Sequence, residues 1–291
     1  MNLFTPGMPF WKGNLHCHTT ESDGKLTPAQ VKALYRKKGY DFLALTDHRK
    51  MTENTHMEGG MLMLSGMEMD FSLSGEFLHL IGIGMDESIL RYDLTRMPQH
   101  CIDMYRRCGG RAILAHPAWS LNTLSTLSGL RHLTAAEIYN SVSTYPWNGD
   151  RADSSVILDT AAAHGVFFRF VASDDSHRYN GEAGNGFTMI QAPDLTRESL
   201  FEALDAGRFY CSQGPSFQQI SVEDHLLKVS CSPVDTILYY SNVIWTPNRC
   251  QTGKAMTEGV YDLSVNHGET YVRVQLIDAN GRSAWSNPIL L

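Results

Sequence analysis

The chain carries a series of histidine and acidic residues at the ends of short apolar runs, between residues 16 and 177 of its 291 residues. Nine of them have side chains that bind metal ions well: His16, His18, Asp23, His48, Glu68, His79, His116, Asp175 and His177. Residues i and i+2 of a strand point to the same face, so His16/His18 and Asp175/His177 can each clamp an ion. Imidazoles and carboxylates without a thiolate pair are typical of catalytic zinc, manganese or iron. The series therefore predicts a catalytic metal centre.

Some members of the series also have simpler interpretations. Glu68 could be an exposed acid and His79 a core histidine, while Asp23 follows Ser22 and precedes Gly24 in a sequence typical of a turn. The histidines outside the series are interpreted as structural, because a lone histidine more often satisfies a hydrogen bond than binds a metal; they are His56, His100, His132, His164, His225 and His267.

The first 210 residues alternate between short apolar runs and helix-like segments. Strands are predicted at 14–16, 41–46, 62–65, 77–83, 112–115, 136–139 and 167–172, and helices at 28–38, 97–108, 153–164 and 197–206. Thr27 and Pro28 suit a helix start, and Gly39 suits a helix end. This alternation predicts a parallel sheet, open or closed into a barrel, with the metal-binding side chains at strand ends, where α/β barrels place active sites.

The pattern changes after residues 213–215. Short strands are predicted at 220–222, 226–231, 236–241, 259–265 and 271–278, with turns at Asn266-His267-Gly268 and at 278–281. No helical pattern is present there. A small antiparallel β-sandwich is the structure that this part of the sequence favours.

Composition narrows the class of protein. With 43% hydrophobic and 19% charged residues the chain is typical of a globular protein, and its formal charge of −7 argues against a general nucleic-acid binder. No run approaches the ~18 apolar residues of a membrane span. The N-terminus lacks a signal-peptide pattern and the six cysteines form no CxxC pair, so we expect a cytoplasmic enzyme with core thiols. Cys17 is expected to face the barrel wall.

Four motifs resemble those of the PHP (polymerase and histidinol phosphatase) family of metal-dependent phosphoesterases. They are GNLHCHTTESDG at 13–24, LALTDH at 43–48, His116-Pro117, and DDSH at 174–177. The resemblance runs from Trp11 to about His177. It implies an α/β fold in which a distorted (β/α)7 barrel (residues 1–211) precedes the β-sandwich (212–291). The Ser-Asp-Gly variant of the first motif and the β-rich tail resemble a two-domain branch that includes carbamate hydrolases.

The resemblance also implies a trinuclear site with two to three divalent ions, Zn, Mn or Fe. The three groups of ligands would be His16, His18, Glu68 and Asp175; Glu68, His79 and His116; and Asp23, His48 and His177. A metal-bound hydroxide held by Glu68 and Asp175 would be the catalytic group. Asp174 lacks the i, i+2 relation to His177 and is expected to face away from the ions.

Other polar and aromatic residues are candidates for contact with the substrate. Arg49 and Arg178 directly follow candidate ligands, where a guanidinium suits bidentate contact with phosphate but would equally balance the acidic ligands. Asn140 ends a predicted strand, and the resemblance makes it face the site. Trp119 and Tyr179 could stack on a base or aryl group, or cap the barrel.

The sequence thus predicts a metal-dependent phosphoesterase acting on a small phosphomonoester or nucleotide-like substrate. The expected partner is a phosphorylated small molecule, with no membrane and no extended nucleic acid. Because a metal-activated hydroxide also attacks carbonyls, an amide or carbamate hydrolase with the same site is the alternative. A non-catalytic binding module that uses the β-sandwich is a third possibility, against which the full ligand set argues.

Overall fold

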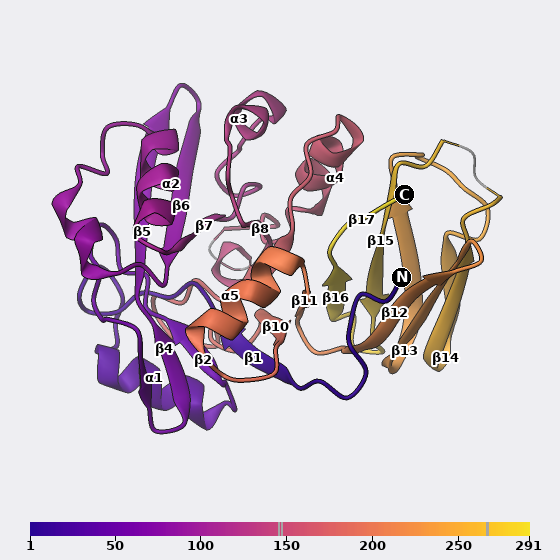
Figure 1. Cartoon of the computed structure of the whole chain (residues 1–291), viewed down its shortest axis with the longest axis horizontal. Helices are drawn as coiled ribbons and strands as arrows, with labels where there is room; N and C mark the ends of the chain where they lie inside the picture. Colours follow the sequence, from indigo (N-terminus) through magenta and orange to yellow (C-terminus); the bar gives the residue numbers. More distant parts are fainter. Residues whose placement is uncertain (145, 147, 266–267) are drawn as a thin grey trace.

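The computed structural model describes residues 1–144, 146, 148–265 and 268–291, and it has two β-rich parts. All of the described α-helices belong to the N-terminal part, and the strands of the C-terminal part lie beside it (Figure 1). The predicted Asn266-His267 turn lies outside the described residues, while the turn at 278–281 is present, with Gly281 donating its N–H to the Asp278 carbonyl. None of the described helices is long and apolar enough to cross a membrane.

The elements of the N-terminal part alternate irregularly. Its strands are β1 (Phe10–Asn14), β2 (Phe42–Ala44), β3 (His56–Glu58), β4 (Met61–Leu64), β5 (Gly66–Leu73), β6 (Glu76–Ile83), β7 (Arg111–Leu114), β8 (Ala135–Asn140), β9 (Phe170–Ser173), β10 (Phe187–Gln191) and β11 (Phe209–Ser212). Its helices are α1 (Pro28–Lys37), α2 (Pro98–Arg107), α3 (Leu124–Gly129), α4 (Ser155–Ala163) and α5 (Arg197–Ala206), with 3-10 turns η1 (Glu87–Arg91) and η2 (Ser141–Ser143).

The predicted helix starts are confirmed where capping chemistry specified them. Thr27 caps α1 and forms a reciprocal capping box with Gln30, with Pro28 at the first position. Gly39 follows α1 with φ of 72°, a conformation that glycine adopts without steric cost.

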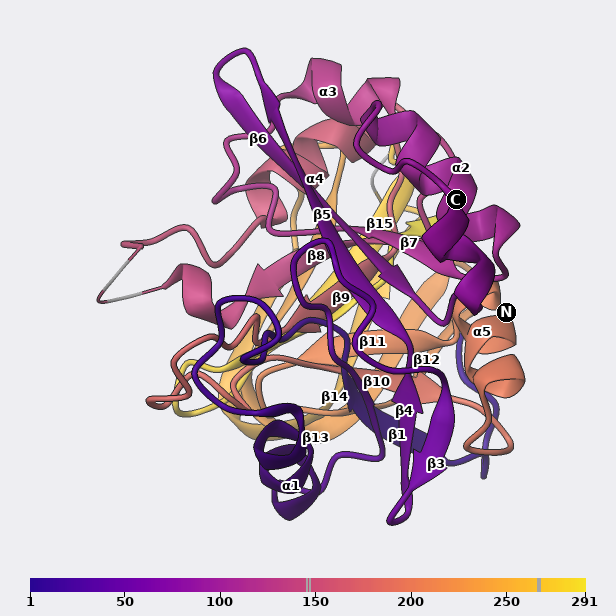
Figure 2. The same cartoon turned by 90° about the vertical axis from the view of Figure 1, so that its left-hand side faces the viewer.

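The sheets of the N-terminal part are mixed, which corrects the expectation of a parallel sheet. β1–β2, β2–β4, β7–β8 and β8–β9 are parallel, whereas β5–β6, β6–β7, β1–β10 and β10–β11 are antiparallel. The β5–β6 connection is too short to cross over a sheet, so its strands must pair antiparallel. This hairpin projects beyond its neighbours in Figure 2.

Two isolated bridges join the sheet that contains β1 and β2 to the sheet that runs from β5 to β9. Cys17 bridges to Ser176 after β1 and β9, and His48 bridges to Glu68 between the end of β2 and β5. The two sheets therefore meet next to the predicted ligands. The specific (β/α)7 pattern stays a prediction.

The strands of the C-terminal part pair antiparallel throughout. They are β12 (Phe217–Glu223), β13 (Leu226–Ser241), β14 (Cys250–Asp262), β15 (Tyr271–Ile277), β16 (Ser283–Ser286) and β17 (Ile289–Leu290). β13 pairs with β12, β14 and β15, and its register against β14 breaks between Ser230 and Thr236. These strands enclose one apolar core.

The two parts are held together by hydrogen bonds, ring packing and a buried ion pair. β11 pairs with β16, and Trp285 of β16 stacks on Tyr139 of β8 with ring centroids 5.7 Å apart. Arg273 of β15 is fully buried and donates to both carboxylate oxygens of Asp159 in α4, at 2.7 and 2.5 Å.

We predict that Asp159→Asn destabilises the chain by about 3 kcal/mol, because it leaves the buried guanidinium without its counter-charge. Urea unfolding measures the change in free energy. Asp205→Asn is the matched control. Asp205 also accepts hydrogen bonds from Nε and Nη2 of an arginine, Arg111, but its side chain is 48% exposed. Exposed pairs contribute only about 0–1 kcal/mol. Equal losses in the two variants would contradict a special role for the Arg273 pair.

Candidate metal centre

The structure brings all nine predicted ligand side chains to one side of the N-terminal part. Six of them follow strand ends as expected: His16 and His18 after β1, His48 after β2, His116 after β7, and Asp175 and His177 after β9. Asp23 follows further along the loop after β1. Glu68 and His79 instead lie inside the hairpin strands β5 and β6. His79 is paired across the hairpin with Asp70, two residues after Glu68.

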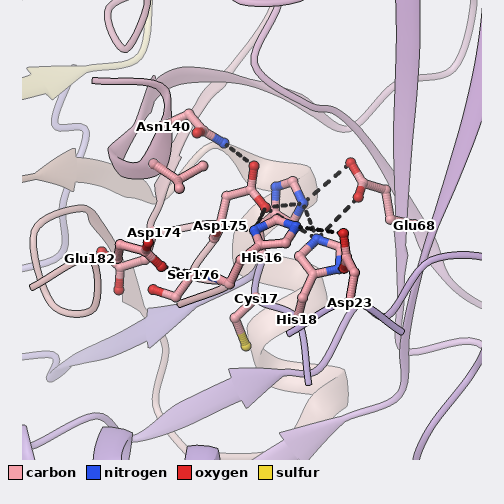
Figure 3. A network of polar contacts seen from close by, with 12 residues as sticks. His16, Cys17, His18, Asp23, Glu68, Asn140, Asp174, Asp175, Ser176 and Glu182 are labelled. Atoms are coloured by element: carbon pink, nitrogen blue, oxygen red, sulfur yellow. Dashed lines mark hydrogen bonds and ion pairs between the residues drawn. The ribbon is translucent and has the colours of Figure 1, made fainter. Parts of the chain in front are cut away.

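Glu68 is at the centre of this assembly. Its carboxylate is almost fully buried and lies 2.9 to 3.5 Å from ring nitrogens of five histidines: His16, His18, His48, His79 and His116. Oε1 faces His16, His79 and His116, while Oε2 faces His18 and His48 (Figure 3 shows the contacts of Glu68 with His16 and His18). One carboxylate therefore reaches both sides of the histidine cluster, as a bridging ligand would.

Asp175 is the second buried carboxylate. Its Oδ1 lies 3.1 Å from Nε2 of both His16 and His18 and 3.5 Å from Nδ1 of His177. Its backbone φ is 52°, in the left-handed region that non-glycine residues rarely occupy, and His116 has φ of 28°. Unusual backbone conformations of this kind concentrate at functional sites, where the surrounding structure imposes them.

A third group surrounds Asp23, whose side chain is 55% exposed. Its Oδ2 lies 3.5 Å from Nε2 of His177 and 3.9 Å from Nε2 of His48, and its Oδ1 lies 3.6 Å from Nδ1 of His18. The ring of His18 stacks on that of His177 at 4.1 Å. The same four residues form a set whose ligand atoms all lie within 4.8 Å of one another.

The donor geometry suits divalent cations. Two more sets at this centre meet the same distance limit: His16, His18 and Asp175, and His16, Glu68 and His116. The Nε2 atoms of His16 and His18 are only 3.3 Å apart, and Oδ1 of Asp175 is buried without a hydrogen bond from the described residues. Buried polar atoms are rarely left without a partner, so a cation between these groups fits the arrangement.

The charges of the centre are strongly coupled. Burial by itself raises the pKa of Glu68. The neighbouring histidines, His16 foremost, outweigh this effect and hold that pKa well below its usual value. Burial lowers the pKa of His18, but the adjacent carboxylates of Asp175 and Glu68 outweigh this effect and raise that pKa to about 9. Protons on the imidazoles thus balance the carboxylates, and cations that bind here must displace them.

Sequence reasoning missed Glu137, a fully buried acid of β8. Its Oε1 accepts from Nδ1 of His16 at 2.9 Å, and its Oε2 accepts from the backbone N–H of His116 and from Nδ2 of Asn140, both at 2.8 Å. This fixes the tautomer of His16, so that Nε2 points to the centre. The available signal was an acidic residue within the apolar run 135–140.

Two further aspartates brace the loops. Asp174 faces away from the centre, as expected, and accepts N–H groups of Gly184, Asn185 and Gly186. Burial raises its pKa to about 6. Asp47, next to His48, accepts hydrogen bonds from the hydroxyl groups of Thr19, Ser22 and Thr52, which holds the loop bearing Asp23.

The predicted substrate-contacting residues have different surroundings. Arg178 lines a cavity of about 460 Å³ together with Lys25, Trp119 and most of the predicted ligands. Arg49 lies outside that cavity, 62% exposed, and donates to both oxygens of Asp70. Asn140 is buried and donates to Glu137 and to Asp175 (Figure 3), so it orients the centre from within.

Two other expectations concern side chains next to the ligands. Cys17 is buried in the wall as expected, with Sγ directed at the Ala44 carbonyl, and burial raises its pKa well above the usual range. The Tyr179 hydroxyl donates to the His18 carbonyl at 2.5 Å, which places it among the residues that pack behind the centre. Of the two aromatic candidates, Trp119 is the one that lines the cavity.

The fold of the chain is similar to those of solved structures. A two-domain protein from Bacteroides vulgatus containing a predicted PHP-like metal-dependent phosphoesterase matches 99% of this chain and 97% of its own, with a TM-score of 0.54 and 15% identity. An amidohydrolase from Chromobacterium violaceum matches 68% of this chain and 96% of its own, with a TM-score of 0.43 and 17% identity. No family model matches the sequence.

A local sequence match accompanies these structures. It is to a 5′-3′ exoribonuclease of Haemophilus influenzae, 32% identical over 82 residues, which are 26% of this chain and 30% of the relative. The match thus spans about a third of that protein's length. The likeness to the Bacteroides vulgatus protein covers nearly the whole chain and shows a PHP-like fold, in agreement with the motifs.

We predict that Glu137→Gln weakens metal binding about 10- to 100-fold, the range typical of an orienting partner of a ligand. The amide can still accept from His16, but its NH₂ group would face two donors, His116 N–H and Asn140. Competition titration with a chromogenic chelator measures affinity, and thermal melting of the metal-free protein checks folding. The exposed Glu202→Gln is the control for lost charge. Unchanged affinity in Glu137→Gln would remove it from this role.

Proposed function

We propose that the chain is a metal-dependent hydrolase of phosphate esters, acting on a small phosphomonoester or nucleotide-like substrate. One observation carries the proposal: two buried carboxylates, Glu68 and Asp175, lie among six histidines beside a cavity large enough for a small molecule. A structural metal site would be closed by its own ligands and would need no such cavity. This arrangement supports catalysis by bound cations.

The nine ligands of the sequence prediction divide among two or three cations in this proposal, with Glu68 as the bridge. Bound divalent ions supply Lewis-acid activation of water and neutralise phosphoryl oxygens. Zinc, manganese and iron all suit the imidazole and carboxylate donors. Glu137 and Asn140 hold His16 and Asp175 in place, so the donors are pre-oriented before any ion or substrate binds.

The surroundings of the cavity support an anionic substrate. Lys25 and Arg178 line the side near Asp23 and His177, where they can contact phosphate oxygens. A phosphate dianion also uses the field of several cations better than a neutral carbonyl does. The relative named as an exoribonuclease suggests a phosphate ester too, but the net charge of −7 favours small substrates over long polyanions.

The architecture is part of the same proposal. The ring of strands would be a distorted (β/α)7 barrel over residues 1–211, and residues 212–291 would be a separate domain that covers one barrel face. A cytoplasmic location and independence from membranes complete the proposal.

We predict that protein purified without chelator contains two to three divalent ions per chain. Elemental analysis by mass spectrometry counts them, and Asp23→Asn should lower the count by about one, because Asp23 belongs to the most exposed of the three groups. Fewer than two ions in protein with intact ligands would contradict a multinuclear centre.

We also predict hydrolysis of p-nitrophenyl phosphate by the metal-loaded protein. Glu68→Gln should reduce turnover by at least about 100-fold, comparable to losing a major electrostatic contributor, because it changes the ligand that reaches both sides of the cluster. Glu202→Gln serves again as the control. Near-normal turnover in Glu68→Gln at saturating metal would remove Glu68 from the centre. Cleavage of an aryl carbamate or amide without phosphatase activity would replace the phosphoester proposal by its alternative.

A further inference from the structure

A second cavity of about 540 Å³ lies beside the metal centre. It is lined by His48, Arg49, Asp70, Phe77, His79 and Trp119. Three of these residues, His48, His79 and Trp119, also line the central cavity, so the two spaces adjoin. We call the second space the aromatic cleft.

Two aromatic side chains, Phe77 and Trp119, line the aromatic cleft. Phe77 precedes His79 by two residues in β6, so both side chains point to the same face of the strand. Phe77 is nevertheless 55% exposed, on the β5–β6 hairpin that projects in Figure 2. Its backbone N–H donates to the Ser120 carbonyl at 3.1 Å, which ties the hairpin to the loop that carries Trp119.

Trp119 is held in a fixed orientation next to the candidate ligands. Its Nε1 donates to Oδ1 of Asn148 at 3.0 Å. Its ring centroid lies 4.9 Å from that of His116 and 5.9 Å from that of His79. An aromatic surface so close to the metal centre can contact whatever is attached to a group bound there.

The remaining wall carries little net charge. Arg49 donates to both carboxylate oxygens of Asp70, at 2.9 and 2.6 Å, and the two charges therefore offset each other. The cations Lys25 and Arg178 line the central cavity instead. The aromatic cleft thus suits an uncharged flat group better than a second phosphate, and this reassigns Arg49 from phosphate contact to the wall of the cleft.

We propose that the aromatic cleft binds a flat aromatic or heteroaromatic ring in the leaving group of the substrate. The inference rests on the proposed function, since it takes the phosphoryl group to lie at the metal centre and the rest of the molecule to extend past His79. Phe77 and Trp119 are then the residues that determine specificity. An aryl group and a nucleobase share the chemistry that this surface recognises.

The test compares two substrates that differ in the ring alone. Benzyl phosphate and cyclohexylmethyl phosphate both release a primary alcohol and have similar size, but only the first has a flat π face. We expect the wild-type protein to favour benzyl phosphate by about tenfold in kcat/KM, the order that stacking on an aromatic face contributes. Adenosine 5′-monophosphate against ribose 5-phosphate tests in the same way whether a nucleobase is the ring.

Phe77→Leu should reduce each preference to about twofold or less, because Leu keeps apolar bulk but lacks the flat aromatic face. Phe77 is exposed, so this variant should fold. Trp119→Leu should act in the same direction. Trp245→Leu, at a tryptophan that is 77% exposed in the C-terminal part, is the matched control and should keep the wild-type preference.

A binding measurement separates this inference from the proposed function. Calorimetric titration of the metal-loaded protein with benzylphosphonate and cyclohexylmethylphosphonate should show the same preference and the same loss in Phe77→Leu. If that pattern holds without turnover of any phosphate ester, the aromatic cleft stands and the proposed function fails. If phosphate esters are hydrolysed but neither Phe77→Leu nor Trp119→Leu changes the ratios, the aromatic cleft is overturned and the function stands.

Discussion

The buried carboxylate of Glu68 is the constraint on which the rest of the site depends. An ionised carboxylate without water must be compensated, and here five imidazoles from four separate segments provide the compensation. Each of those segments must therefore pass through one place. The strand bridges His48–Glu68 and Cys17–Ser176 occur at that place, so the same contacts that shape the centre also join the two sheets.

Strand β8 links the metal centre to the C-terminal part. Its register against β9 shifts between Glu137 and Tyr139, a bulge that breaks the simple alternation of faces. Glu137 and Asn140 consequently face the centre, whereas Tyr139 stacks on Trp285 of the C-terminal part. Contacts on both sides of β8 hold its side chains in place, and an orienting hydrogen bond to a metal ligand requires such support.

The two cavities beside the centre differ in chemistry. The central one combines ligands with cationic side chains, and the adjoining one presents aromatic faces and an internally paired Arg49–Asp70. A hydrolase that fixes a charged group at its metal and reads the remainder of the molecule elsewhere gains specificity from the second space. The hairpin β5–β6 supplies Glu68 to the first cavity and Phe77 to the second, so in the proposed function one element would couple chemistry to recognition.

The sequence by itself predicted the candidate ligand residues that belong to motifs, and the structure brings them together. Their spacing encodes local geometry: two residues apart after a strand end, as in His16 and His18, or in a turn after a strand, as in His177. The sequence also determined the capped helices, since Thr27 and Gln30 satisfy each other within a few residues. These features depend on neighbours in the chain, and local spacing is enough to predict them.

Only the tertiary structure decided the features that depend on distant neighbours. The pairing direction of β5 and β6 put Glu68 and His79 inside strands rather than at their ends, and the bulge in β8 turned Glu137 toward His16, 121 residues away. The position of the Arg49 side chain depends on its hydrogen bond to Asp70, and no local sequence pattern connects these two residues. The physical reason is that a side chain's partner across the fold, and not its own residue type, fixes which way it points and what charge it leaves free.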